Sequence, residues 1–505
     1  MGRRRADGRP PTPATEAGPD PRRWKALALL CAAYFMVIVD SQIVILALPA
    51  IESDLNFSTS GVQWVLSAYL LSFGGLLLFG GRTADLLGGR RMFMFGTVLF
   101  LITSVICGLA WTSEVLVVTR IVQGVTAAIM APTAMAVLMN TFGEGSDRNR
   151  ALGIWTAIGA FGATAALLIG GVITDRPGWE CIFFINIPIA LVVLFLGPRL
   201  LRETPIAQGR RSFDPVGAVT ITAGLALLIY VIVEAPEVGW GDATTLGLLA
   251  VAAVLIIGFI FVEQRVAQPL IPLRVFRSPT LVGGNIMMLL VAMATYGGAL
   301  ITSLYAQEVL GYTAIFFGLS TAVYSAMSIV GSNVSGLVAT RVGFKPVAIV
   351  GMTLLGIGTL LLAQVSAYGN YFGDLFWGLL IFGIGIGIGT TVVASSIAAL
   401  SGARPREAGL ASGINNSVFQ IGAALGIAVC SSVALAFTRA EGPAREALTE
   451  GYQAAFMATA VMAGIGLLVA VTLMAVRQSQ PRPAARTTDT SQPTEEPSTV
   501  TAGQD

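Results

Sequence analysis

Asp40 and Arg120 are the charged residues that lie deepest inside long apolar stretches of the sequence. A charge within a lipid bilayer is costly, so an ionisable residue there is by default a candidate for function. An aspartate can exchange its proton for a cationic substrate or an arginine, because either one stabilises the ionised carboxylate. We hypothesise that Asp40 binds a proton from outside and releases it inside, and that Arg120 favours release in one state. The alternative is a static ion pair that holds two helices together.

Side chains suited to enzymatic or metal chemistry are scarce. The sequence has no histidine, and its four cysteines, Cys31, Cys107, Cys181 and Cys430, form no C-x-x-C pair that would indicate a zinc site. The glycine run at 383–389 lacks the G-K-[ST] of a phosphate-binding loop. We therefore expect no enzyme activity, no metal and no cofactor. Transport would draw on an ion gradient, such as that of protons, or on the gradient of the substrate itself.

The elements that must position Asp40 and Arg120 follow from composition. Hydrophobic residues make up 55% of the 505 residues and charged residues only 11%, whereas a soluble domain has about a quarter charged residues. Apolar stretches of roughly 20 residues are long enough to cross a bilayer, and in lipid they must be helical. We expect an all-α integral membrane protein with fourteen transmembrane helices. The expected helices span residues 25–48, 62–81, 92–110, 115–139, 151–173, 181–197, 215–233, 244–262, 281–304, 314–338, 347–366, 372–400, 408–436 and 452–476.

The positions of the basic residues predict the orientation of these helices. Nearly all of the 30 Lys and Arg residues fall in alternate loops and in the two tails, while the remaining loops hold only Arg176, Arg439 and Arg445. Lys and Arg collect on the cytoplasmic side of a membrane, so both termini are expected there. Asp40 then lies roughly 12 Å from the outer end of its helix and Arg120 roughly 9 Å from the same surface, at similar depth.

An internal repeat divides the chain into halves. The segment 81–90, which contains Gly81, Gly88 and Arg90, matches a segment 255 positions later that contains Gly336, Gly343 and Lys345. Such duplication is typical of transporters, and it leaves helices 7 and 8 as an insertion. The expected divisions are a disordered cytoplasmic tail at 1–23, a six-helix bundle at 24–198, two linker helices at 199–270, a second six-helix bundle at 271–477 and a disordered cytoplasmic tail at 478–505.

The segment 81–91 resembles the signature of the major facilitator superfamily, G-x-x-x-D-x-x-G-x-[RK]-[RK]. Gly81, Asp85, Gly88, Arg90 and Arg91 occupy its fixed positions. The glycines allow a tight turn, and Asp85 can pair with the positive N-terminus of a helix from the other half. The resemblance therefore implies a gating loop here, with Gly336, Gly343 and Lys345 as its counterpart in the second half. A solvated basic turn is the alternative.

Further motifs are similar to the fourteen-helix drug:proton antiporter branch of that superfamily. They are Asp40–Pro49, Arg120–Gly124, Phe184–Pro188 and Ala411–Asn416. The resemblance implies that Asp40 and Arg120 face a central cavity. The other candidate cavity residues are Gln42, Trp64, Tyr69, Gln123, Asn186, Asn415, Asn416 and Gln420.

The chain departs from this branch at three places. Ala166-Leu167 stands where the antiporter motif has Gly-Pro, Glu180-Cys181 replaces Arg-Trp, and Phe419 replaces an Arg. The Pro-made bend of helix 5 is thus missing. These changes bear on antiport rather than on the fold.

These observations predict proton-coupled efflux of small amphiphilic drugs or antibiotics across a bacterial cytoplasmic membrane. With one deep carboxylate, neutral or singly cationic substrates are expected. An exporter of a lipid or other long-chain amphiphile is an alternative, and a membrane sensor that moves no solute is another. The formal charge of +2 offers no basic field for nucleic acid. The expected partners are the substrate, protons and membrane lipid, and we expect a monomer.

Overall fold

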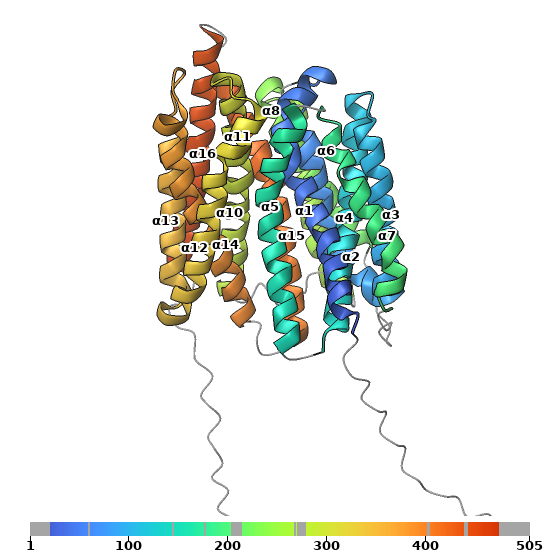
Figure 1. Ribbon diagram of the computed structural model, residues 1–505. Helices are drawn as coiled ribbons and strands as arrows, with labels where there is room; N and C mark the ends of the chain where they lie inside the picture. Colours follow the sequence, from blue (N-terminus) through green and yellow to red (C-terminus); the bar gives the residue numbers. More distant parts are fainter. Residues whose placement is uncertain are drawn as a thin grey trace, which may run out of the picture.

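The computed structural model describes residues 21–58, 61–143, 146–175, 178–203, 215–266, 269, 279–400, 405–438 and 443–473. Among these residues it contains 14 helical segments long and apolar enough to cross a membrane, which confirms the expected number. The helices run side by side, and the beginning of α1 and the end of α16 lie at the same end of the bundle (Figure 1). The predicted tail at 478–505 lies outside the described residues, as do residues 1–20 of the other tail.

The helices of the first half pack mainly against one another, with α4 lying against both α2 and α3 and α1 against α5 and α7. Their bounds are α1 (Arg23–Asp54), α2 (Trp64–Leu87), α3 (Gly89–Gly108), α4 (Ser113–Thr141), α5 (Ser146–Asp175), α6 (Cys181–Phe184) and α7 (Asn186–Leu200).

The second half forms a matching group, in which α14 packs between α12 and α13 while α10 lies against α15 and α16. In Figure 1 this group is on the left and the first half on the right. Its elements are α10 (Pro279–Leu304), the π-helix η2 (Tyr305–Val309), α11 (Ala314–Ser320), α12 (Ala322–Val342), α13 (Phe344–Leu362), the π-helix η3 (Tyr371–Leu375), α14 (Phe376–Leu400), α15 (Pro405–Phe437) and α16 (Ala444–Leu473). The predicted domain boundaries stay a prediction.

Two helices lie between the halves in sequence, α8 (Pro215–Val238) and α9 (Ala243–Arg265). α8 packs against α2 of the first half and α15 of the second, so it touches both groups. Asp242 caps α9, because its side chain accepts a hydrogen bond from the backbone N–H of Thr244 at 2.7 Å. This bond lowers the pKa of Asp242 below its ordinary value.

Several helices differ from their expected bounds. The predicted helix 181–197 is broken at Ile185, between α6 and α7. Pro188 lacks the N–H that would bond the carbonyl of Phe184, so the break follows from the local sequence. Helix α16 begins at Ala444 rather than residue 452, and α1 continues to Asp54. Both helices continue through polar residues beyond their apolar spans. Hydropathy marks only the apolar span, so it does not predict these helix ends.

Candidate functional site

Asp40 of α1 and Arg120 of α4 form an ion pair inside the first half. The guanidinium Nη1 of Arg120 donates to Oδ2 of Asp40 at 2.6 Å, and both side chains have an exposed fraction of 0%. Within the described residues this is the one ion pair with both members completely buried. The sequence placed the two residues at similar depth, and the structure brings them into direct contact.

Amide side chains complete the coordination of the carboxylate. Nδ2 of Asn186 on α7 donates to Oδ1 of Asp40 at 2.8 Å, and Nε2 of Gln123 on α4 donates to the same oxygen at 3.2 Å. Both amides also donate to Oγ of Ser104 on α3, at 3.3 and 2.9 Å respectively. Four helices therefore meet at Asp40, and both of its oxygens accept hydrogen bonds.

Arg120 is fixed by contacts beyond Asp40. Its Nε donates to the carbonyl of Val65 at 2.9 Å, and its Nη1 also donates to Oε1 of Gln123 at 2.8 Å. The Tyr69 ring centroid lies 4.1 Å from Cζ of the guanidinium, and that of Phe183 lies 5.7 Å away. The negative face of an aromatic ring stabilises a cation, most strongly where water is excluded. These contacts balance part of the desolvation of the arginine.

The network is closed in this conformation, which corrects one expectation. We expected Asp40 and Arg120 to face a central cavity, whereas both are enclosed among α1, α3, α4 and α7. The reason is the rotation of α1 and α4 about their own axes, which directs both side chains toward the interior of the first half. Two polar atoms in the cluster, Nη2 of Arg120 and Oδ1 of Asn186, have no hydrogen-bond partner. An unsatisfied buried donor is unfavourable, so the closed network is not at its optimum.

The remaining candidate cavity residues fall into different surroundings. Gln42 of α1 donates from Nε2 to the Tyr296 hydroxyl on α10 at 2.9 Å, which links the two halves. Gln420 on α15 is buried against α2, where a Cβ at Gly74 would clash with its Cβ. Trp64 lies against Tyr230 of α8, with ring centroids 6.4 Å apart. On α15, Asn415 is buried and Asn416 is exposed.

Sequence reasoning missed Ser104 and Phe183 in the polar cluster. It indicates Tyr296 only as one of several Met and aromatic residues suited to an adaptable cavity, and the structure places it at the contact between the halves. In the structure the side chain of Ser104 is fully buried. The sequence signal that could have identified it is a polar residue inside an otherwise apolar helix. Phe419, which replaces an Arg of the family pattern, packs edge-on against Tyr296 with centroids 6.0 Å apart. An aromatic contact thus stands where a charge was expected from the resemblance.

The repeated signature is helical rather than a loop. α2 continues to Leu87 and α3 begins at Gly89, so only Gly88 separates them. Gly88 has φ +96°, a left-handed conformation that favours glycine. Gly343 stands alone between α12 and α13 in the same way, with φ +86°. Gly81 lies within α2 and Gly336 within α12.

The basic residues that follow these turns also correspond. Arg90 donates from Nη2 to the Pro198 carbonyl at 3.1 Å, near the end of the last helix of the first half. Lys345 donates to the Val471 carbonyl at 2.6 Å, near the end of the last helix of the second half. Cations bind favourably at helix C-termini, where carbonyl groups lack intrahelical partners. Arg91 lies 3.7 Å from Glu203. The side chain of Asp85 is outside the described part of the chain.

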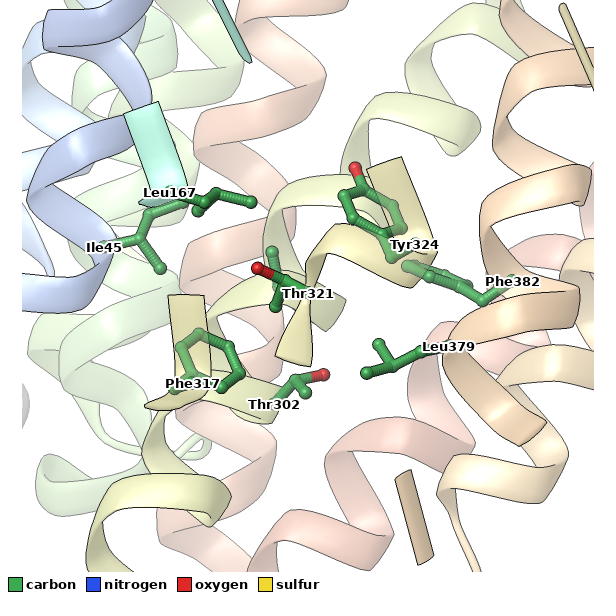
Figure 2. A pocket seen from close by; sticks show the side chains of 9 residues that line it. Ile45, Leu167, Thr302, Phe317, Thr321, Tyr324, Leu379 and Phe382 are labelled. Carbon is green, nitrogen blue, oxygen red and sulfur yellow. The ribbon is translucent and has the colours of Figure 1, made fainter. Parts of the chain in front are cut away.

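A small cavity of about 20 Å³ lies between the halves, room for about one water molecule. Figure 2 shows Ile45 of α1 and Leu167 of α5 on the left, with Phe317 of the second half below them, and Tyr324 and Phe382 of the second half on the right. Leu167 occupies the position where the antiporter motif has proline. In this conformation the central contact is almost filled by apolar side chains.

Comparison with known proteins places the chain in a family. The family model described as Major Facilitator Superfamily matches residues 30–427 and 284–501. The chain belongs to the major facilitator superfamily. The cephamycin export protein CmcT of Amycolatopsis lactamdurans is 37% identical over 90% of this chain and 93% of its own length. The tetracenomycin C resistance and export protein of Streptomyces glaucescens is 35% identical over 81% of this chain and 75% of its own.

Solved structures of this superfamily share the fold. A bacterial homolog of the human lysosomal transporter Spinster, solved in an inward-facing and unoccupied conformation, matches with a TM-score of 0.64 and 18% identity. The match covers 92% of this chain and 100% of that structure. The predicted fold class and superfamily are therefore confirmed. The chain is a multi-pass membrane transporter related to bacterial antibiotic exporters.

Proposed function

We propose that this transporter exports small amphiphilic drugs or antibiotics across the bacterial cytoplasmic membrane in exchange for protons, by alternating access. The observation that carries the proposal is the buried carboxylate of Asp40, held by Arg120, Gln123 and Asn186 from two other helices. The relatives named for cephamycin and tetracenomycin export support the substrate class. Both chain termini would lie in the cytoplasm, as the loop charges predict.

The closed network suggests how protonation changes the conformation. Each oxygen of Asp40 faces donors: Arg120 at Oδ2, and the amides of Gln123 and Asn186 at Oδ1. A protonated carboxyl group must donate its own hydrogen and has lost its charge. It can no longer satisfy all three donors, so protonation weakens the link between α1, α4 and α7. Deprotonation re-forms the network and completes the cycle.

The paired turns at Gly88 and Gly343 would serve as gates in this cycle. Each connects two helices through a single residue, and each is followed by a base held near the end of another helix. Movement of α3 would thus be transmitted to α7 through Arg90. The corresponding contact in the second half, through Lys345, would move α13 and α16 together.

Proton coupling can be tested with the purified chain in lipid vesicles. We expect an imposed proton gradient to drive cargo exchange by the natural chain, and Asp40→Asn to bind cargo without releasing protons or responding to the gradient. Glu114→Gln is the matched control, because Glu114 is an exposed carboxylate on α4.

If Asp40→Asn still exchanges cargo for protons, the proposed coupling is wrong. If the chain moves a fluorescent phospholipid across the vesicle membrane but does not move drugs, the lipid-export alternative replaces the proposed substrate class.

A further inference from the structure

A second, larger cavity lies at the end of the bundle opposite the described chain ends. Its volume is about 840 Å³, within the range of sites for drug-sized ligands. It is walled by the end of α1, by α10 with η2, by α15 and α16, and by the linker helix α8. It is separate from the Asp40 network, none of whose members lines it.

The walls combine apolar surface with negative charge. Val233 of α8, Leu300 of α10 and Ala434 of α15 line the cavity with apolar surface and are otherwise buried, whereas Glu308 of η2 also lines the cavity and is exposed. Glu52 of α1 also lines the cavity, close enough to Glu308 for the two carboxylates to repel each other. A cation bound between them would relieve that repulsion.

The basic side chains near the cavity do not line it. Among the described residues that line the cavity there is no Lys or Arg. The neighbouring Arg445 of α16 donates from Nε to the Val309 carbonyl at 2.6 Å and lies over the Tyr368 ring, 5.5 Å from its centroid. The Tyr452 hydroxyl donates to Oε2 of Glu308, which fixes one side of that carboxylate.

We propose that this cavity binds amphiphilic organic cations with a single positive charge, with Glu308 and Glu52 contacting the charge and the apolar walls contacting the body. Charge complementarity selects this occupant, since an anion would meet two carboxylates and no base. Its place in export, as a site that receives cargo before release to the outside, rests on the proposed function. Binding at equilibrium requires no proton gradient.

The linker helix gives the site a wall that two six-helix bundles alone would lack. Val233 of α8 faces the cavity, and Oγ of Ser432 on α15 donates to the Ile232 carbonyl at 2.5 Å. α8 is thereby fixed to the second half at the level of the cavity. Helix α8 of the inserted pair thus acquires a role in ligand binding.

Equilibrium binding to the purified full chain in lipid nanodiscs tests the proposal without transport. The probes are tetraphenylphosphonium, an apolar monovalent cation, and triphenylphosphine oxide, a neutral molecule of similar shape. We expect Glu308→Gln and Glu52→Gln each to weaken tetraphenylphosphonium binding about fivefold, a typical effect of one partly solvated ion pair. Binding of the neutral probe should be unchanged in both variants.

Two further variants make the result decisive. Glu446→Gln removes an exposed carboxylate of α16 outside the cavity and should leave cation binding intact. Ser431→Phe places a ring in the cavity and should weaken binding of both probes. Unchanged cation affinity in both carboxylate variants would overturn the proposal. Asp40→Asn should lose proton coupling and still bind the cation normally. Coupling that survives in Asp40→Asn contradicts the proposed function alone, whereas unchanged cation affinity in Glu308→Gln and Glu52→Gln contradicts the cation site alone.

Discussion

At the residue scale, the carboxylate of Asp40 is the centre of a buried network built from four helices. Its three donors come from Arg120, Gln123 and Asn186, and the aromatic rings of Tyr69 and Phe183 cover the guanidinium. Removing one partner of a buried charge is more damaging than removing an exposed group, because the remaining charge stays unsolvated. Stability and, under the proposed function, proton coupling therefore depend on the same side chains.

Asn186→Leu tests this dependence. It removes the donor that lies 2.8 Å from Oδ1 of Asp40, so we expect a loss of about 1–3 kcal/mol in the free energy of unfolding. Denaturant unfolding in detergent measures it. Asn333→Leu is the control, since its exposed amide donates only to the Ile329 carbonyl of its own helix, and it should change stability by less than about 0.5 kcal/mol. Equal effects of the two substitutions would contradict the buried-network interpretation.

At the element scale, close helix contacts set the orientation of the site. Gly124 lies one turn after Arg120, and a Cβ there would clash with Oγ of Ser72 and with the Tyr69 carbonyl on α2. This close approach of α4 to α2 places Arg120 beside the Val65 carbonyl. Helix α5 is continuous because Leu167 stands where the family motif has proline, and its carbonyl lies against Gly318 of α11.

Gly124→Ala is expected to separate α2 from α4. One added methyl group in a filled contact costs about 1–3 kcal/mol of stability, and cargo exchange should fall as Arg120 moves. Gly258→Ala on α9 is the matched control, because nothing lies within 4 Å of the added Cβ. Alanine is the better helix former there, so the control should be neutral or more stable by about 0.5–1 kcal/mol. Thermal unfolding with a transport assay distinguishes the two, and a neutral Gly124→Ala would refute the steric argument.

At the scale of the whole molecule, polar contacts among the described residues join α1 of the first half to α10 and η2 of the second. Gln42 donates to Tyr296, and Ser303 and Gln307 donate to the carbonyls of Ile45 and Leu46 at 3.3 and 3.4 Å. These bonds join α1 to α10 and η2, and Ile45 also lines the small apolar contact shown in Figure 2. Opening between these elements must break them, so they bias the equilibrium between conformations.

Tyr296→Phe removes the 2.9 Å hydrogen bond from Gln42 and should shift the equilibrium toward the open form by about 0.5–1.5 kcal/mol. Distances between spin labels at the exposed positions Asn56 and Tyr368 would report a larger open fraction. Tyr371→Phe serves as the control, because its hydroxyl donates to Ser320 within the second half. No change with Tyr296→Phe, or an equal change with Tyr371→Phe, would argue against this contact as a gate.

The sequence by itself determined the membrane class, the number of helices and the superfamily, because length, apolarity and turn glycines act locally. It also identified Asp40, Arg120, Gln123 and Asn186, whose polarity is conspicuous in apolar helices. Only the tertiary structure decided that these residues face one another within the first half rather than a cavity between the halves. Helix rotation decides which face is enclosed, and rotation is set by contacts such as Gly124 on Tyr69 between helices distant in sequence. The cavity beside Glu308 likewise exists only where five helices from three parts of the chain converge.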